Sequence, residues 1–196
     1  MKKRLFDIFF SFVGLAILLP VFVVFSLMIV FDSRGGIFFR QIRVGKNEKD
    51  FRLWKFRTMY GGSEIKGLLT VGAKDSRITR TGYFLRRYKL DELPQLINVF
   101  CGTMSFVGPR PEVRKYTDQY DPEQKRVLLI KPGITDFASL EYANENEILG
   151  KTDDPEKTYT QEIMPAKLAL NLKYINEMSL TTDVKIILRT IRRIFL

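Results

Sequence analysis

A long apolar run near the N-terminus constrains the fold more than any other feature of this sequence. Residues 8–31 contain no charged side chain, whereas basic residues stand before and after them. Eighteen or more residues of this kind predict a segment inside a membrane. The run is too long for the apolar part of a signal peptide, and no small-residue cleavage pattern follows it. We therefore expect a membrane segment at residues 1–33 and one membrane-associated domain at residues 34–196.

Pro20 lies near the middle of this run and bears on its path through the membrane. Proline lacks a backbone donor and clashes with the carbonyl four residues earlier, at Ala16, so we expect a kink. Each half would measure roughly 18 Å, which is shorter than a hydrocarbon core of roughly 30 Å. Both flanks are basic, and basic flanks favour the cytoplasmic side. A re-entrant helix-break-helix fits these features, but so does a kinked spanning helix, because spanning helices tolerate proline.

Composition narrows the chemistry that the domain can perform. The chain has 32 Lys and Arg against 22 Asp and Glu, which indicates an anionic partner such as nucleic acid, lipid headgroups or phosphorylated substrates. It has no histidine, so a Ser-His-Asp triad, a histidine base and a histidine metal site are excluded. Its one cysteine, Cys101, excludes an intramolecular disulfide and is expected to be a small buried hydrophobe.

Short strand and helix patterns follow the apolar run, so we expect an α+β fold that is dominated by helices and contains one small β-hairpin. The expected hairpin joins strands at 37–44 and 51–56 through a turn at 45–49. The other expected elements are helices at 84–89, 91–100, 121–127 and 161–178, loops at 63–75 and 131–150, and a stiff turn at 108–111.

The last segment, residues 183–196, has the pattern of a basic amphipathic helix. One face carries Val184, Ile187, Leu188, Ile191, Ile194 and Phe195, and another carries Lys185, Arg189, Arg192 and Arg193. Such a helix is expected to lie in a membrane interface, with its cations among anionic lipid headgroups. The alternative is a helix that packs its apolar face into the core and exposes its basic face to water.

The middle of the chain concentrates cations, namely Lys55, Arg57, Arg77, Arg80, Arg86, Arg87 and Arg110. The forked guanidinium of arginine suits phosphate oxygens. Lys55 and Arg57 would share one face of a strand. Arg110 stands between two prolines, which restrain its backbone and so lower the entropy cost of binding a ligand. Taken singly, each cation is more simply explained as a solvated surface charge.

Asp91 and Glu92 stand among these cations, and Pro94 follows at a spacing that suits the first turn of a helix. Asp91 is therefore expected at or near a helix N-cap. One interpretation is that it only caps the helix. The other is that the helix N-terminus and nearby arginines lower its pKa, so that an ionised carboxylate attacks phosphorus and forms an acyl phosphate. Glu92 would then help to hold Mg²⁺, which prefers carboxylate and phosphate oxygens.

Longer motifs occur in a characteristic order at residues 55–59, 75–82, 90–99, 104–112, 131–135 and 183–186. They include Leu90-Asp91-Glu92-Leu93-Pro94-Gln95-Leu96 and Gly108-Pro109-Arg110-Pro111-Glu112. Together they resemble the motifs of the bacterial sugar transferase family, the monotopic phosphoglycosyl transferases. The resemblance covers essentially the whole chain and matches the minimal form of that family, without extra N-terminal spanning helices.

The resemblance implies a two-step reaction. Asp91 would attack the β-phosphorus of a UDP-sugar, release UMP and carry the phosphosugar covalently. A polyprenyl phosphate, typically undecaprenyl phosphate, would then accept it. Mg²⁺ is the implied cofactor, with Asp91 and Glu92 as the catalytic and metal-binding pair. The implied substrate-binding residues are Lys55, Arg86 and Arg110, with Asp75, Arg77 and Arg87 as weaker candidates.

The resemblance also implies where such an enzyme works. A re-entrant helix with both ends in the cytoplasm would place the domain on the cytoplasmic face of the bacterial inner membrane, among anionic lipids, for the first membrane step of glycoconjugate assembly. Nucleic acid is not an expected partner, and a homodimer is one alternative for the oligomeric state. The competing hypothesis is a membrane-anchored phosphate- or nucleic-acid-binding module without catalysis. Such a module, however, gains nothing from a carboxylate pair among arginines.

The sequence departs from the family pattern at two places. The family often has Ser-Pro at the helix break, whereas Leu19 precedes Pro20 here, so a hydroxyl for the freed carbonyl has to come from Ser11 or another neighbour. The family's Gly-Ile-Thr-Gly-Leu-Ala-Gln stretch is Gly-Ile-Thr-Asp-Phe-Ala-Ser at residues 133–139. If this stretch contacts the sugar, the sugars that the chain accepts would differ from those of other members.

Overall fold

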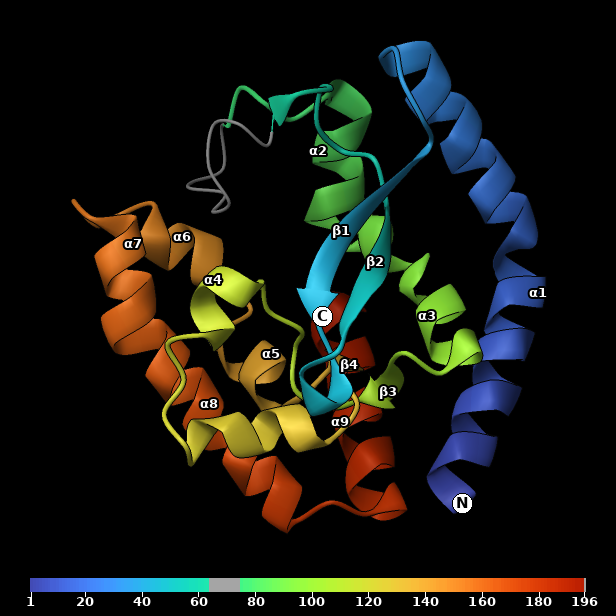
Figure 1. Ribbon diagram of the computed structural model, residues 1–196. Coiled ribbons are helices and arrows are strands. Elements are labelled where there is room, and N and C mark those ends of the chain that lie inside the picture. Colours follow the sequence, from blue (N-terminus) through green and yellow to red (C-terminus); the bar gives the residue numbers. More distant parts are fainter. Residues whose placement is uncertain (64–74, 196) are drawn as a thin grey trace.

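The computed structural model describes residues 1–63 and 75–195, and it has the expected α+β fold with helices in the majority (Figure 1). A long helix, α1 (Lys2–Asp32), runs along one side of the molecule. Beside it lies a hairpin formed by β1 (Phe38–Val44) and β2 (Asp50–Phe56). Most of the loop expected at 63–75 falls outside the described residues.

α1 continues through Pro20 as one helix of 31 residues. Figure 1 shows it bowed, with its concave side toward the domain. A bend agrees with the backbone donor that proline lacks. The two half-helices expected from the sequence are therefore one bent helix. The hydroxyl of Ser11 is used elsewhere than at the proline, because it donates to the carbonyl of Asp7 at 2.5 Å.

The first turns of α1 are bound to the domain by charged side chains. Lys3 forms a salt bridge with Asp183 of α9 (Leu180–Phe195). Arg4 donates to two backbone carbonyls at the end of α3 (Gln95–Cys101), at 2.6 and 2.7 Å. These hydrogen bonds satisfy carbonyls that the end of a helix leaves without partners. The N-terminal end of α1 is thus attached to two other helices.

The last turn of α1 is bound to the domain as well. The carboxylate of Asp32 accepts from the backbone amide of Thr81 at 2.8 Å. Arg57 is buried and donates to backbone carbonyls at and beyond the end of α1, including that of Ser33 at 2.7 Å. The sequence places Arg57 beside Lys55 among the phosphate-binding cations, but its guanidinium instead caps the C-terminal end of α1.

Between these bound ends, α1 exposes a broad apolar surface. Its exposed members are Leu5, Ile8, Phe9, Phe10, Phe12, Ile17, Leu19, Val23, Val24, Leu27, Met28, Val30 and Phe31. By length and composition the helix could cross a membrane, although no membrane is present. An apolar surface of this extent is typical of a region that contacts lipid or a partner.

The β-hairpin forms where the alternation of side chains predicts it, with both strands within one residue of the expected bounds. β1 pairs antiparallel with β2 along its whole length. In the connecting turn, Asn47 adopts the left-handed backbone conformation (φ 55°), which asparagine tolerates better than most residues. The hairpin matters for the site because it carries Lys55 near the end of β2.

After the undescribed residues the chain forms α2 (Arg80–Arg87), a 3-10 turn (Leu90–Glu92) and α3 (Gln95–Cys101). α2 begins four residues earlier than expected, because the hydroxyl of Thr79 accepts from the amide of Gly82 and caps the helix. The helix expected at 91–100 is divided into the 3-10 turn and α3. Cys101 is exposed, contrary to the expectation of burial, because residues 95, 96, 98 and 99 form the buried face of α3.

The stretch 131–150 is ordered, so the expectation of an irregular segment is wrong. It contains β4 (Gly133–Thr135), α5 (Phe137–Glu141) and α6 (Glu145–Leu149). β4 pairs in parallel with β3 (Ser105–Val107) and brings the two segments together. The side chain of Asp136 accepts from the amide of Ser139 and caps α5, a signal that the sequence carries.

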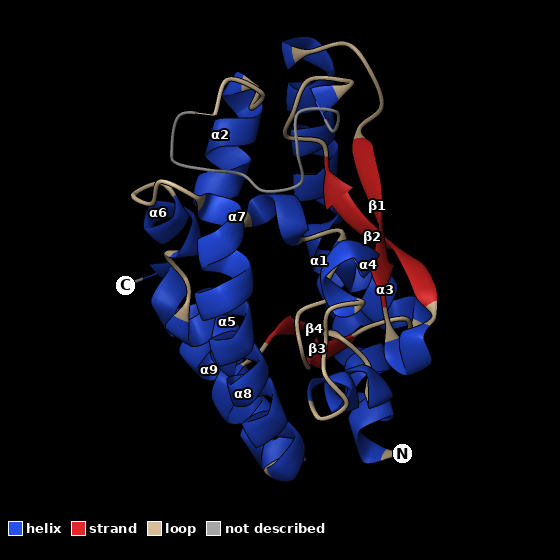
Figure 2. Ribbon diagram, turned by 60° about the vertical axis from the view of Figure 1, so that its left-hand side comes forward, coloured by secondary structure: helices blue, strands red, loops and turns tan. Residues whose placement is uncertain are grey.

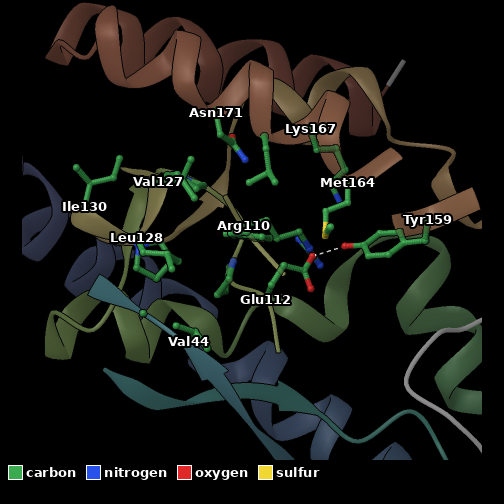
Figure 3. Close-up of a pocket in the computed structure, with 16 residues that line it drawn as sticks. Val44, Arg110, Glu112, Val127, Leu128, Ile130, Tyr159, Met164, Lys167 and Asn171 are labelled. Atoms are coloured by element: carbon green, nitrogen blue, oxygen red, sulfur yellow. Dashed lines mark hydrogen bonds between the residues drawn. The ribbon is translucent and has the colours of Figure 1, made fainter. Parts of the chain in front are cut away.

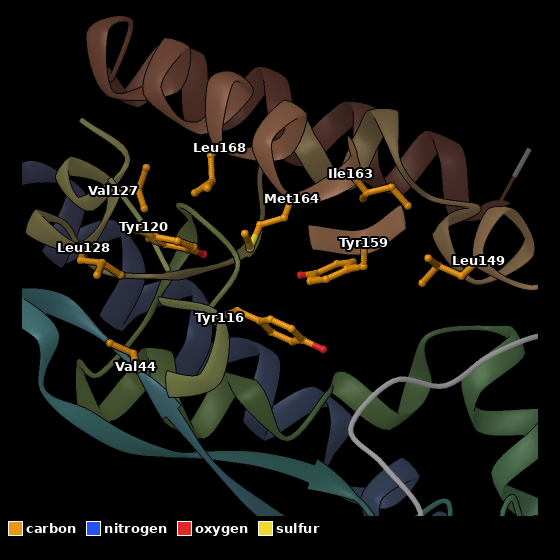
Figure 4. Packing of buried hydrophobic residues seen from close by; sticks show 10 residues of the cluster. All are labelled: Val44, Tyr116, Tyr120, Val127, Leu128, Leu149, Tyr159, Ile163, Met164 and Leu168. Carbon is orange, nitrogen blue, oxygen red and sulfur yellow. The ribbon is translucent and has the colours of Figure 1, made fainter. Parts of the chain in front are cut away.

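One buried cluster packs beneath α8 (Met164–Asn176), as Figure 4 shows. Its members are Val44, Tyr116, Tyr120, Val127, Leu128, Leu149, Tyr159, Ile163, Met164 and Leu168. They come partly from α4 (Arg114–Thr117), the 3-10 segment Gln124–Leu129, and the helical turns that precede α8, which are α7 (Pro155–Thr158) and a π-helical turn (Tyr159–Ile163). Figure 2 shows α8 and α9 on the side of the molecule opposite the hairpin.

α9 exposes the apolar face that the sequence assigns to a membrane interface. Asp183 and Ile186 of this helix are 2% and 0% exposed, and the partly buried Ile187 packs against a core cluster. Leu188 and Ile191 remain 61% and 48% exposed. Among the apolar residues of this face whose side chains are described, more are exposed than packed against the core, which favours the interfacial alternative over the core-packing one.

The capping role of Arg57 gives a prediction about stability. Arg57→Met would remove the charged donor from the carbonyls of Ser33 and Arg34 at the end of α1, so we expect about 2 kcal/mol of destabilisation, or a fall in Tm of roughly 5 °C. Thermal unfolding in detergent micelles measures the effect. Arg52→Met, at an exposed position of β2, is the matched control and should leave Tm unchanged. Equal Tm values for the two variants would contradict the cap.

Candidate active site

Asp91 and Glu92 lie in the 3-10 turn that joins α2 to α3. The turn is entered through Lys89, whose backbone is left-handed (φ 57°). Pro94, and not Asp91, is the residue that precedes the first turn of α3. Asp91 was expected at or near a helix N-cap; it lies three residues before the N-cap Pro94, in a short turn, and so it does not itself cap α3.

Glu92 is held by two cations from distant segments. Its Oε1 accepts from Nζ of Lys55 at 2.8 Å, and its two carboxylate oxygens also accept from the two terminal nitrogens of Arg110. Burial alone would raise the pKa of Glu92, but the charges and hydrogen bonds of Arg110 and Lys55 hold that pKa well below its usual range. Glu92 is thus a permanent anion that fixes two cations.

The pKa of Asp91 is shifted in the opposite direction to that of Glu92. The side chain of Asp91 is buried, and within residues 1–63 and 75–195 no group donates a hydrogen bond to its carboxylate. Burial raises its pKa and the negative charge of Glu92 adds to the effect, while Lys55 and Arg86 oppose it. The functional interpretation of the sequence expects a lowered pKa for Asp91, whereas its surroundings raise that pKa, because the loss of water outweighs the charges of Lys55 and Arg86.

The position of Lys55 relative to the dyad is set by Asn98, a buried residue of α3. Its side-chain oxygen accepts from the amide of Trp54 at 2.9 Å, and its nitrogen donates to the carbonyl of Arg52 at 2.8 Å. One amide side chain therefore joins α3 to β2 at Arg52 and at Trp54, the residue just before Lys55. Sequence patterns do not reveal this link, since Asn98 stands in an ordinary helix pattern.

The loop that carries Arg110 is braced from its other side. Arg43 donates to the carbonyl of Pro111 and to the carboxylate of Glu112, both at 3.2 Å. The hydroxyl of Tyr159 donates to Glu112 at 2.6 Å, as Figure 3 shows. Figure 3 also shows a small hollow lined by 16 residues, of which Arg110 is the one shared with the charged cluster at Glu92. The dyad does not line this hollow.

Two further cations surround Asp91. Arg86 of α2 lies close enough for its charge to lower the pKa of Asp91. Lys89 was not among the expected site residues, yet burial and the charge of Arg110 lower its pKa, and both dyad carboxylates act on it. Its place two residues before Asp91 is the signal in the sequence that marks it. Lys55, Arg86, Lys89 and Arg110 together exceed the two carboxylates by two positive charges, which suits an anion such as a diphosphate.

The three weaker candidates, Asp75, Arg77 and Arg87, differ in how they relate to the dyad. Asp75 and Arg77 form an ion pair with each other at 2.6 Å, and that pair lowers the pKa of Asp75. The charge of Arg86 also acts on Asp75, so the pair lies near the edge of the site. Arg87 is exposed and lies over the ring of Tyr88, 5.7 Å from its centroid, and the charges that act on Asp91 do not include it.

The donor atoms near the dyad suit a divalent cation only in part. No group of three or more His, Cys, Asp or Glu side chains that could hold a metal ion occurs among the described residues. Glu92 already receives Lys55 and Arg110, whereas no residue in the described part of the chain donates a hydrogen bond to the oxygens of Asp91. The dyad therefore offers one free carboxylate, and a Mg²⁺ ion would need phosphate oxygens and water for its remaining ligands.

The electrostatics predict how the pKa of Asp91 responds to its neighbours. Glu92→Gln removes a negative charge and should lower that pKa, whereas Lys55→Met removes a positive charge and should raise it. The carboxyl ¹³C shift of Asp91, titrated in EDTA and assigned with Asp91→Asn, measures both. Movement of the two variants in the same direction would refute this account.

Comparisons with known proteins agree with these geometric findings. A family model described as bacterial sugar transferase matches residues 1–196. UDP-glucose:undecaprenyl-phosphate glucose-1-phosphate transferase of Escherichia coli (strain K12) is 38% identical over 192 residues, which cover 96% of this chain and 39% of that protein. UDP-N-acetylgalactosamine-undecaprenyl-phosphate N-acetylgalactosaminephosphotransferase of Aeromonas hydrophila is 35% identical over 195 residues, covering 98% and 43%.

A shorter relative matches almost end to end. Exopolysaccharide production protein PSS of Rhizobium leguminosarum bv. phaseoli is 36% identical over 196 residues, which cover 96% of this chain and 92% of that protein. The chain thus spans about two fifths of the length of the first two relatives and nearly all of the third. On the match over its full length and on these identities, the chain belongs to the bacterial sugar transferase family.

Proposed function

We propose that this protein transfers a phosphosugar from a UDP-sugar to a polyprenyl phosphate such as undecaprenyl phosphate. The observation that carries the proposal is the contrast within the dyad: Glu92 is bound by two cations, and Asp91 is buried beside it without hydrogen bonds from the described residues. The printed names of two relatives describe undecaprenyl-phosphate transferases that differ in their sugar, so the donor is proposed as a class.

Asp91 is the proposed nucleophile. A carboxylate oxygen attacks the β-phosphorus, the bond from that phosphorus to the bridging oxygen breaks, and UMP leaves with the electron pair. An oxygen of the acceptor phosphate then attacks the same phosphorus and displaces Asp91, which is regenerated as a carboxylate. A raised pKa makes an ionised carboxylate more basic, and none of the described residues occupies its lone pairs with a donor, so both features favour attack.

The cations around the dyad bind the charge that this reaction moves. Glu92 holds Lys55 and Arg110 in fixed positions before the donor arrives, and so less reorganisation is needed when charge shifts to the leaving phosphate. Arg86 and Lys89 add positive charge on the Asp91 side. Asp91 would hold Mg²⁺ together with the donor phosphates, and the ion would supply further neutralisation of the diphosphate.

The packing of α1 supports a re-entrant placement on one face of the membrane. Lys3 and Arg4 at its start and Asp32 at its end all bind the same polar domain. A straight crossing would separate those ends by the thickness of the bilayer. α2 and α3, which flank the dyad turn, both contact α1. We therefore place the site at the membrane surface, on the cytoplasmic face where nucleotide-sugars occur.

The first test is detection of the covalent intermediate. Incubation with a panel of UDP-sugars and Mg²⁺, without acceptor, should release UMP and add the mass of one phosphosugar to Asp91, as measured by intact-protein and peptide mass spectrometry after acid quenching. Asp91→Asn should lose the adduct and at least 10³-fold of the transfer rate, on the order of the losses seen when a nucleophile is removed.

Asp118→Asn is the matched control for this test, because Asp118 is exposed and pairs with Arg114, which does not belong to the group of charges around the dyad. It should retain both the adduct and the rate. Consumption of the donor without any adduct in the unmodified protein would refute the covalent mechanism. An adduct that persists in Asp91→Asn would refute the assignment of Asp91.

The second test concerns topology. Lys2→Cys and Gly36→Cys, each in a Cys101→Ser background, place thiols at the first residue of α1 and just after its end, at exposed positions. In intact cells an impermeant maleimide should label neither thiol, and both should react after the inner membrane is opened. Labelling of one thiol alone in intact cells would show that α1 crosses the membrane.

A further inference from the structure

The loop that carries Arg110 contains an unusual arrangement of backbone donors. Proline has no amide hydrogen, so in Pro109-Arg110-Pro111 the amide of Arg110 is the one backbone donor. That amide donates to Oδ2 of Asp136 at 3.2 Å. The hydrogen bond to Asp136 is therefore the contact that holds the backbone amide of Arg110.

Asp136 is 0% exposed and joins two structures with its two carboxylate oxygens. Oδ1 accepts from the amide of Ser139 and caps α5, and Oδ2 accepts from Arg110. α5 packs against both α8 and α9, so the carboxylate is anchored to the helical side of the molecule. Burial of a carboxylate is unfavourable unless donors compensate for it, and these two amides supply such donors.

We propose that Asp136 is a positioning residue for Arg110. Its carboxylate fixes the backbone at Arg110, so that the guanidinium reaches Glu92 in one orientation and is ready to receive donor phosphate. The carbonyl of Pro109 belongs to the same peptide unit as the amide of Arg110, and it accepts from the amide of Gly133 at 3.0 Å. This peptide plane is therefore held at its carbonyl by Gly133 and at its amide by Asp136. The inference deepens the proposed function and rests on it.

This role follows from the reach of the side chain. Aspartate presents two oxygens on a short, stiff stem, and each oxygen meets a different amide. Glycine, which the family pattern has at this position, offers neither oxygen. In this chain the phosphate-facing arginine is therefore coupled to α5 by a side chain that such a glycine cannot provide. A shift of about 1 Å in a positioning group is enough to lower a reaction rate on the order of 100-fold.

Asp136→Ser separates positioning from capping. Serine is a good N-cap and retains an oxygen for Ser139, but it is too short to reach Arg110 as well. We expect the Arg110 amide, observed with ¹⁵N-arginine and assigned with Arg110→Lys, to exchange its hydrogen on the order of 10-fold faster. We also expect kcat/KM for the UDP-sugar to fall by roughly 10-fold to 100-fold. Asp136→Asn, which keeps the length but can accept only one of the two amides, is the second variant should serine prevent folding.

Asp154→Ser is the matched control, because Asp154 caps α7 through the amide of Lys157 at 3.0 Å and has no link to Arg110. It should leave the Arg110 amide and kcat/KM unchanged. In an Arg110→Ala background, Asp136→Ser should cause no further loss, since the two changes interrupt one interaction. Losses that multiply, or unchanged protection of the Arg110 amide, would overturn the proposal.

Binding of UDP distinguishes the failure of this inference from the failure of the proposed function. An unmodified protein that binds UDP and transfers phosphosugar, but whose Asp136 and Arg110 variants act independently, would refute the positioning role alone. An unmodified protein that neither binds UDP nor consumes any UDP-sugar would refute the proposed function. Amide exchange at Arg110 still decides in that case whether Asp136 fixes this backbone.

Discussion

Glu92 accepts hydrogen bonds from Lys55 and Arg110, which lie 37 and 18 residues away along the chain. A buried charge is stable only when it is paired, so this carboxylate requires β2, the dyad turn and the proline-bounded loop to meet at one point. Once they meet, four cations surround two carboxylates and the local charge is positive. The arrangement of the remaining site residues depends on this contact, because without it Lys55 and Arg110 would have no fixed place beside Asp91.

The dyad also shows how neighbouring carboxylates acquire different roles. Glu92 is held as an anion by its partners, whereas Asp91 is dehydrated and repelled by Glu92, so their pKa values move in opposite directions. Titratable neighbours whose environments separate their pKa values are a common sign of divided catalytic roles. In the proposed mechanism, Glu92 supplies structure and charge and Asp91 supplies the nucleophile. Lys89, which was not among the site residues expected from the sequence, adds a further positive charge.

Binding of α1 at both ends relates this chemistry to the membrane. The helix is not a separate anchor, because Lys3, Arg4 and Asp32 bind the domain and Arg57 caps its last turn. α2 and α3 both pack against α1. The turn between them, which holds the dyad, therefore lies near the apolar surface of α1. A water-soluble donor and a lipid acceptor need to meet at such a boundary. α9 also exposes apolar side chains, among them Leu188 and Ile191.

The sequence alone determined the features that depend on neighbours along the chain. The apolar run, the hairpin, the amphipathic C-terminal helix and the motif around Asp91 are all set by side-chain periodicity or short spacing. Tertiary structure decided the direction of the Asp91 pKa, the capping role of Arg57, the order within 131–150 and the contact of Asp136 with Arg110. These depend on burial and on distances between segments far apart in the chain, and a local pattern carries neither quantity.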